Sequence, residues 1–240
     1  MTVATQREQG ILFASLDRPE ADNRLDAATV DELTAIFEGI GADQDPPAVI
    51  VLGSTSSDFS LGRQRVEGSP QTPSAITAEF QRIQRLNDAV QRCKAVTVAA
   101  ITGRAEGAGL SLAARCDIVV VAEDARLSFP EIPHGIPPTI VLSHYRYVLP
   151  RSILGDLIFT GRVLDGQEAV RFGLAARCVP AAQVEDEARE IASVVAGYDR
   201  RSIALVKEFL ARTESVSPVD APGLGIALYA LEMVDRALAD

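Results

Sequence analysis

The chain has 240 residues, of which 47% are hydrophobic, and a formal net charge of −10. This length and apolar content suffice for one substantial core with a helical appendage, and they exclude a chain that is disordered throughout. The negative charge, without a cluster of basic residues, argues against a protein that binds nucleic acid, because such proteins need a basic surface to displace counterions from phosphates.

The first part of the chain alternates predicted strands and helices. A strand is expected at Ile11–Leu16 and a buried one at Ala48–Leu52, and between them Asp26 can cap an amphipathic helix. The segment Phe59-Ser60-Leu61-Gly62-Arg63 then leads into a loop rich in Gly, Pro and Ser. Loops of this kind often border a ligand site. A second amphipathic helix follows, with Thr72 as its cap and proline at its first position.

The segment from Ala99 to Phe129 is the most informative part of the chain. A strand that ends at Ile101 is followed by a glycine-containing turn, Gly103–Gly109, then by a short helix and by a second strand, Ile118–Ala122. The first residues of a helix carry amide hydrogens without a partner and a partial positive charge. Glycines let a ligand atom approach these amides. The pattern therefore predicts a site that stabilises a developing negative charge.

From Val184 onward the pattern is almost wholly helical. The apolar residues form stripes at helical spacing, and such stripes must be buried on the core or on a neighbouring subunit. The members of the three stripes are Ala188, Ile191 and Val194; Ile203, Val206 and Leu210; and Leu224, Leu228, Leu231, Val234 and Leu238. We therefore divide the chain into a core at residues 1–183 and a C-terminal helical region at residues 184–240.

The cysteines and the start of the chain indicate the cellular compartment in which we expect the protein. Cys93, Cys116 and Cys178 lie far apart and in no metal-ligand spacing, which indicates reduced thiols and no metal site. The first residues lack the pattern of a signal peptide, and no apolar run is long enough to span a bilayer. We expect a cytoplasmic protein that does not bind a membrane.

Several motifs follow one another in the order seen in the crotonase (enoyl-CoA hydratase/isomerase) superfamily. They are Asn23-Arg24-Leu25-Asp26, Phe59-Ser60-Leu61-Gly62, the run from Ala100 to Gly109, Cys116-Asp117, the run from Pro130 to Pro138, and Thr160-Gly161-Arg162 with Gly173-Leu174. The chain resembles this superfamily from about residue 11 to residue 180. The resemblance implies an α/β fold, a crotonase-like ββα superhelix (spiral), with a C-terminal helical trimerisation region. It also implies acyl-CoA thioesters as substrates, a homotrimer or homohexamer, and no metal or redox cofactor.

The resemblance also implies a set of site residues. The backbone N–H groups of Arg63 and Ala108 would form an oxyanion hole for the thioester oxygen, and Glu131 would be the acid/base. Burial in an apolar slot would raise the pKa of this glutamate and let it exchange protons near neutral pH. A solvated loop glutamate is the alternative. The residues expected to bind the substrate or its CoA part are Leu61, Gly62, Arg65, Gly107, Gly109, His134 and Lys207.

Ser111 departs from the family pattern. Efficient hydratases of the superfamily carry a second glutamate at this position, and a serine cannot act as a base. One glutamate resembles the enoyl-CoA isomerases, whereas a serine with a glutamate resembles the hydroxycinnamoyl-CoA hydratase-lyases. Hydration, isomerisation, C–C cleavage and hydrolysis of an aromatic or cyclic acyl-CoA therefore stay open. Ser111 could also simply bond a helix carbonyl.

Two hypotheses from other functional classes remain open. The run from Gly109 to Ala113 resembles a loose nucleophile elbow, so Ser111 could be the nucleophile of a serine hydrolase with His134 or His144 as its base. The protein could also bind acyl-CoA without catalysis.

Other polar side chains have candidate roles in ligand binding. Arg63 and Arg65 could meet the phosphates of CoA, because arginine pairs well with phosphate oxygens, although a solvated charged loop is the alternative. Lys207 is a candidate for the phosphate of the nucleotide. We expect Tyr145 and Tyr147 to pack in the core. The alternative is that they shape a pocket for a bulky acyl group.

Overall fold

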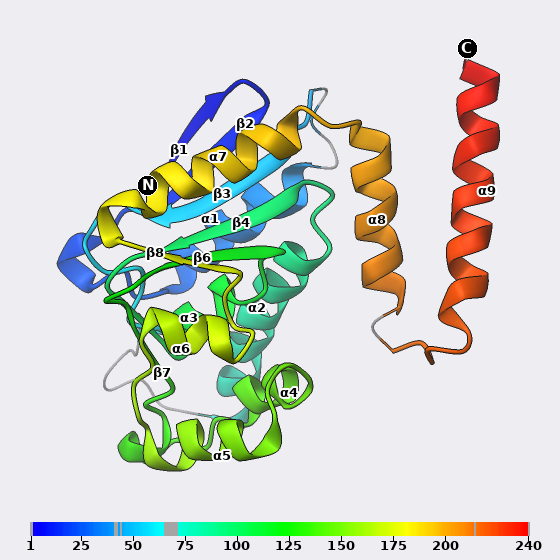
Figure 1. Cartoon of the computed structure of the whole chain (residues 1–240). Helices are drawn as coiled ribbons and strands as arrows, with labels where there is room; N and C mark the ends of the chain where they lie inside the picture. The colour runs from blue at the N-terminus through cyan, green and yellow to red at the C-terminus, as the bar shows by residue number, and fades with distance from the viewer. Residues whose placement is uncertain (1, 41–42, 44, 65–71, 214, 240) are drawn as a thin grey trace.

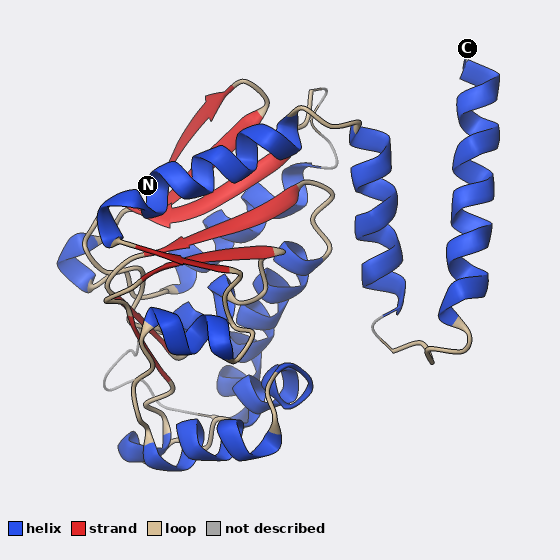
Figure 2. Cartoon of the chain, viewed as in Figure 1, coloured by secondary structure: helices blue, strands red, loops and turns tan. Residues whose placement is uncertain are grey.

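The computed structural model describes residues 2–40, 43, 45–64, 72–213 and 215–239. A six-stranded sheet organises its core, with the strand order β1-β2-β3-β4-β6-β8 (Figures 1 and 2). β1 is antiparallel to β2, and each further neighbouring pair is parallel. The strands are β1 (Val3–Glu8), β2 (Ile11–Leu16), β3 (Val49–Ser54), β4 (Val96–Ile101), β6 (Ile118–Ala122) and β8 (Arg177–Val179).

A second, two-stranded sheet lies beside the first. It pairs β5 (Arg104–Glu106) with β7 (Arg126–Ser128) in parallel. β4 of the large sheet leads into β5 of the small one and then into the helix α3 (Ala108–Ala113), and β6 leads likewise into β7. This succession confirms the expected repeated ββα units. It also places the start of α3 directly after β5 of the small sheet.

Helices cover both faces of the large sheet. α7 (Val184–Ala196) crosses the front of the sheet in Figure 1, and α1 (Ala27–Gly39) lies behind it and packs against α2 (Pro73–Gln91). The Asp26 carboxylate accepts from Thr29 N at 2.8 Å, and Thr72 Oγ1 accepts from Ala75 N at 3.2 Å. Both predicted N-caps are therefore confirmed.

A group of short helices lies below the large sheet in Figure 1. It contains α4 (Thr139–Val148), α5 (Arg151–Thr160) and α6 (Gly166–Arg171), and short 3₁₀ turns occur at Pro19–Ala21, Ile132–His134 and Ala181–Gln183. On α4 the side chain of Tyr145 is 0% exposed, as expected for a core residue. Tyr147 is 76% exposed, so the expectation that it packs in the core is wrong. Two residues along a helix correspond to more than half a turn, which carries Tyr147 to the opposite face.

The last two helices stand away from the core. α8 (Arg200–Thr213) and α9 (Ala221–Ala239) pack on each other beside the sheet (Figure 1). Their exposed apolar side chains include Val206, Leu210, Ile226, Tyr229, Leu231 and Val234. α7 packs on the sheet and buries Val184, Ala188 and Ile191 there. Within the described ranges, none of the helices is long and apolar enough to cross a membrane.

Candidate functional site

The start of α3 presents a free backbone amide. Gly107 precedes the helix with φ of 48°, its N–H donates to the Ser128 carbonyl of β7 (3.0 Å), and its own carbonyl accepts from Ser111 N (2.9 Å). Ala108 is the first helical residue, and its N–H has no hydrogen-bond partner among the residues that the structure describes. This N–H is one of the orphan donors of a helix start.

Arg63 lies in a short segment that pairs with Leu25. Leu25 N donates to the Gly62 carbonyl (2.8 Å), and Gln64 N donates to the Leu25 carbonyl (2.9 Å). These bonds flank Arg63 in a parallel bridge, so the N–H of Arg63 points away from Leu25.

Gly62 brings this segment close to the start of α3. Its φ is +81°, and a Cβ added to it would lie 3.0 Å from the Glu106 carbonyl oxygen and 3.5 Å from Ala108 N. The peptide between Gly62 and Arg63 therefore lies beside the free amide of Ala108.

Gly109 marks a second close approach between the same two segments. A Cβ added there would lie 2.6 Å from both the Cβ and the carbonyl oxygen of Ser60. Leu61, next in the chain, is 6% exposed and packs in the interior. The structure therefore brings together Leu61, Gly62, Gly107 and Gly109 of the predicted site.

The carboxyl group of Glu131 covers this turn. A Cβ added to Gly107 would lie 2.7 Å from Glu131 Oε1. Glu131 Oε2 is buried, and no described residue gives it a hydrogen bond. Burial raises the pKa of Glu131, the charge of Glu106 raises it further, and His134 opposes these effects. A half-buried carboxyl group with a raised pKa can exchange protons, which a solvated loop glutamate would do less readily at neutral pH.

Ser111 lies one helical turn beyond Gly107 and is 8% exposed. In the neighbouring position, the Leu110 carbonyl oxygen accepts a hydrogen bond from Tyr145 Oη at 3.3 Å. The ring of Tyr145 packs edge-on against Phe129, with 4.8 Å between the ring centroids. Burial raises the pKa of Tyr145, so this phenol stays protonated. Tyr145 therefore links α4 to α3 through Leu110 and to Phe129, two residues before Glu131.

Neither histidine is arranged as a base for Ser111. His134 is exposed, and its Nδ1 lies 2.6 Å from the Pro130 carbonyl oxygen. His144 packs edge-on against Tyr145, and burial lowers its pKa to about 4. No hydrogen bond between described residues joins Ser111 to a histidine, so the geometry does not favour a serine hydrolase.

The side chain of Arg63 and that of Lys207 are engaged elsewhere. Arg63 pairs with Glu79 of α2, and its guanidinium lies over the ring of Phe80, 5.1 Å from the centroid. Arg65, the other predicted cation, lies outside the described residues.

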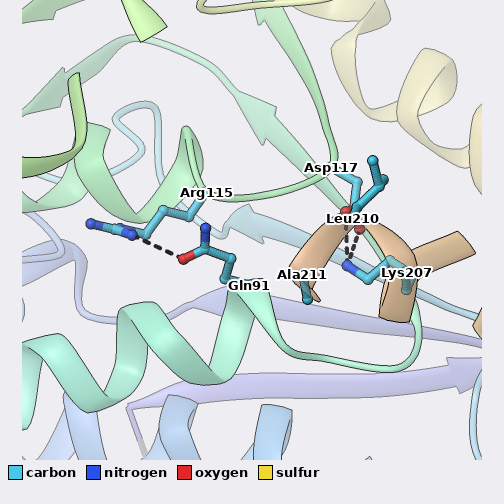
Figure 3. A pocket seen from close by; sticks show the side chains of 6 residues that line it. All are labelled: Gln91, Arg115, Asp117, Lys207, Leu210 and Ala211. Atoms are coloured by element: carbon cyan, nitrogen blue, oxygen red, sulfur yellow. Dashed lines mark hydrogen bonds and ion pairs between the residues drawn. The ribbon is translucent and has the colours of Figure 1, made fainter. Parts of the chain in front are cut away.

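Lys207 Nζ lies 2.7 and 2.6 Å from the two carboxylate oxygens of Asp117 (Figure 3). Asp117 also accepts from the N–H and the hydroxyl of Thr97. The pair borders a small cavity of about 160 Å³ that is also lined by Gln91, Arg115, Leu210 and Ala211. The ammonium group of Lys207 is therefore engaged by Asp117, and its contact with the phosphate of the nucleotide stays a prediction.

Sequence reasoning missed the role of Tyr145 at the site. A fully buried tyrosine needs a partner for its hydroxyl, which is a signal in itself. The sequence did not indicate that the partner lies in α3. Within the described residues, no group of His, Cys, Asp and Glu has the arrangement of a metal site.

Comparison with known proteins identifies the family of the chain. Residues 6–221 match the family described as Enoyl-CoA hydratase/isomerase. The chain is 32% identical over 213 residues to a Mycobacterium tuberculosis protein named "Probable enoyl-CoA hydratase echA8", covering 88% of this chain and 81% of that protein. It is 33% identical over 220 residues to the carnitinyl-CoA dehydratase of Escherichia coli K12, covering 89% and 81%.

Solved structures show the same fold. The enoyl-CoA hydratase of Mycobacterium smegmatis superposes with a TM-score of 0.93 at 24% identity, covering 98% of this chain and 92% of that chain. The enzyme of Bacillus anthracis gives a TM-score of 0.89 at 24% identity, with 96% and 90% covered. The chain therefore has the crotonase fold and belongs to the enoyl-CoA hydratase/isomerase family, whose members are lyase- and isomerase-type enzymes.

Proposed function

We propose that this protein processes acyl-CoA thioesters by stabilising a thioester enolate and moving a proton with a single glutamate. The observation that carries the proposal is the carboxyl group of Glu131 packed against Gly107, directly before the free N–H of Ala108. The N–H of Arg63 is the second donor of the oxyanion hole. In this proposal Leu61, Gly62, Gly107 and Gly109 shape the hole, and His134, three residues after Glu131, contacts the substrate.

The arrangement fits the chemistry of an α-proton. When a base removes the proton next to a thioester carbonyl, negative charge develops on the carbonyl oxygen. Two fixed N–H groups stabilise that charge without reorganisation, and the loss of one such donor typically costs about 10²–10³ in rate. The carboxylate of Glu131 takes the proton and later returns it to the same or another carbon. No electron transfer is involved, so we propose that the reaction needs no cofactor apart from the coenzyme A of the substrate.

The reaction class follows from where the proton returns. Addition of water to a 2-enoyl-CoA and migration of the double bond share the enolate, so both belong to the proposal. A hydratase-lyase or hydrolase that acts on an aromatic or cyclic acyl-CoA is the second candidate. The observation in its favour is the serine at position 111 in place of a second acidic residue.

The exposed apolar faces of α8 and α9 support self-association. Their side chains are uncovered in the single chain, and faces of this size are normally buried in an assembly. We propose that these helices join copies of the chain into a homotrimer or homohexamer. The cytoplasm fits such an enzyme because acyl-CoA is made and used there.

The proposal is tested by exchange of the α-protons of butyryl-CoA and 3-phenylpropanoyl-CoA in deuterated water, followed by mass spectrometry. Wild type should incorporate deuterium, and Glu131→Gln should lose this activity while it still binds the thioester. Glu190→Gln, an exposed glutamate on α7, serves as the matched control and should behave as wild type.

Other outcomes point to the rival classes. Exchange by Glu131→Gln at the rate of wild type would refute the assignment of the base. Binding of the thioesters without exchange or turnover in wild type would indicate a non-catalytic acyl-CoA binder. Labelling of Ser111 by a fluorophosphonate would indicate a serine hydrolase.

A further inference from the structure

Arg63 has two separate anchors, one for its backbone and one for its side chain. Its backbone lies in the parallel bridge with Leu25, between the hydrogen bonds that Gly62 and Gln64 make to Leu25. Its guanidinium pairs with the carboxylate of Glu79 on α2. The residue that carries one of the two N–H groups of the proposed oxyanion hole is therefore held from two directions.

The guanidinium of Arg63 also contacts an aromatic ring of the same helix. Its carbon lies 5.1 Å from the ring centroid of Phe80, which is within the range of a cation–π contact. A planar guanidinium can pair with a carboxylate at its edge while its face lies on a ring. Phe80 itself packs against the core. Glu79 and Phe80 are neighbours on α2, so together they limit both the position and the tilt of the Arg63 side chain.

α2 is a firm support for this side chain. Its inner face is buried at Ile83 and Leu86, and the helix packs along α1. α1 begins directly after its N-cap, Asp26, which follows Leu25 in the chain. The two anchors of Arg63 therefore belong to two helices that pack on each other, and the contacts close a frame around Arg63.

The backbone anchor holds only one end of the peptide that carries the Arg63 N–H. This peptide joins Gly62 to Arg63, and its carbonyl oxygen accepts one hydrogen bond, from Leu25 N at 2.8 Å. Glycine adopts a wide range of backbone angles, so Gly62 adds little restraint of its own. The Arg63 side chain supplies a restraint on the other side of the peptide. Because a donor must lie about 2.7–3.1 Å from the developing oxyanion, a small rotation of this peptide lowers the rate.

We propose that Glu79 is a positioning residue, which acts through the side chain of Arg63 to hold the Arg63 N–H in the direction of the thioester oxygen. The inference rests on the proposed function, in which this N–H is a donor of the oxyanion hole. It assigns the guanidinium of Arg63 to the support of the hole and not to a phosphate of CoA. No bond forms or breaks at Glu79 or at the guanidinium.

The test measures α-proton exchange of butyryl-CoA by Glu79→Gln, which keeps the size of the side chain and removes its charge. A donor of the hole acts on charge that develops in the transition state, so KM should stay unchanged while kcat falls. The side chains of Arg63 and Glu79 are 21% and 40% exposed, so the pair is a weak one. We expect a loss of about fivefold, which corresponds to about 1 kcal/mol.

Charge reversal gives a second readout. Arg63→Glu and Glu79→Arg each bring two like charges together and should each be slower than Glu79→Gln. The double variant restores opposite charges and should recover part of the rate, which a merely structural role of either position would not produce. Glu38→Gln is the matched control, because it removes an ion pair of the same kind between α1 and α2, with Arg85, and should exchange as wild type.

Several results would overturn the inference. Glu79→Gln with the kcat of wild type would do so, and so would a rise in KM at unchanged kcat, which would indicate that the pair binds the substrate. An equal loss in Glu38→Gln would indicate that the pair only stabilises α2. In each of these cases a wild type that exchanges α-protons, and loses exchange in Glu131→Gln, leaves the proposed function standing. A wild type without exchange would contradict both.

Discussion

Replacing Glu131 by glutamine should make the protein more stable at neutral pH while it removes the activity. Glu131 Oε2 is buried without a hydrogen-bond partner among the described residues, and burial raises the pKa of this carboxyl group. A buried polar group without a partner costs about 1–3 kcal/mol, and a charged one costs more. Glutamine keeps the shape but removes the charge, so we expect a gain of about 1 kcal/mol in the free energy of unfolding. In a chain of this size that gain corresponds to a rise of about 2–4 °C in Tm.

The gain should depend on pH in a definite direction. The native pKa of Glu131 lies above its value in the unfolded chain, where it stays near the ordinary 4.5. Between these two values the native state binds more protons than the unfolded state, so the free energy of unfolding falls as the pH rises. Above the native pKa the full penalty is present, and below the unfolded pKa it is absent. The Tm difference between Glu131→Gln and wild type should therefore be largest near pH 8 and close to zero near pH 4.

Differential scanning calorimetry of wild type, Glu131→Gln and the control Glu190→Gln at both pH values measures this difference. Comparing variants at each pH cancels the effects of the other titrating groups. A Glu131→Gln variant that is less stable than wild type at pH 8, or a Tm difference that is equal at both pH values, would refute the reasoning.

Further perturbations test other parts of the account. Gly107→Ala places a Cβ only 2.7 Å from Glu131 Oε1, so the carboxyl group must move. The rate of α-proton exchange should therefore fall at least about tenfold, while the circular dichroism of the protein stays unchanged. Lys207→Met leaves the partly buried carboxylate of Asp117 without its cation and should cost about 1–3 kcal/mol in urea unfolding, part of which Asp117→Asn should restore. Tyr229→Glu puts a charge on the exposed apolar face of α9 and should shift the mass found by light scattering from a trimer or hexamer toward the monomer.

Local signals in the sequence predicted most of the core. The strand Ile11–Leu16 and the strand Ile118–Ala122 have the bounds expected from their apolar runs. Asp26 and Thr72 cap the helices that they were expected to cap, because capping depends on a side chain and an amide only three residues away. Such features are encoded within a few residues and can be read without the fold.

Some strands gave no such signal. β1 (Val3–Glu8) buries Val3 but exposes several of its other side chains, as an edge strand can, so it lacks the alternation typical of a half-buried strand. β5 and β7 have three residues each, which is too short for any period to be visible. These strands form because neighbouring strands are already in place.

The site also has one part that the local sequence predicts and another part that depends on the fold. The glycine turn and the helix start were predicted from the sequence, and the resemblance to the family pointed to Glu131. The contact between Tyr145 and α3 and the pairing of Lys207 with Asp117 join segments far apart in the chain. A sequence shows a buried tyrosine or a lysine on an amphipathic helix, but the partner of each is decided by the packing of α4 and α8.

The central claim is that the N–H groups of Arg63 and Ala108 converge on one oxygen atom next to the carboxyl group of Glu131. A crystal structure of the protein with butyryl-CoA tests it most directly. We predict that the thioester oxygen lies about 2.7–3.1 Å from both nitrogen atoms, with a carboxylate oxygen of Glu131 facing C2. A thioester oxygen that contacts neither amide, or a Glu131 side chain turned away from C2, would contradict the account.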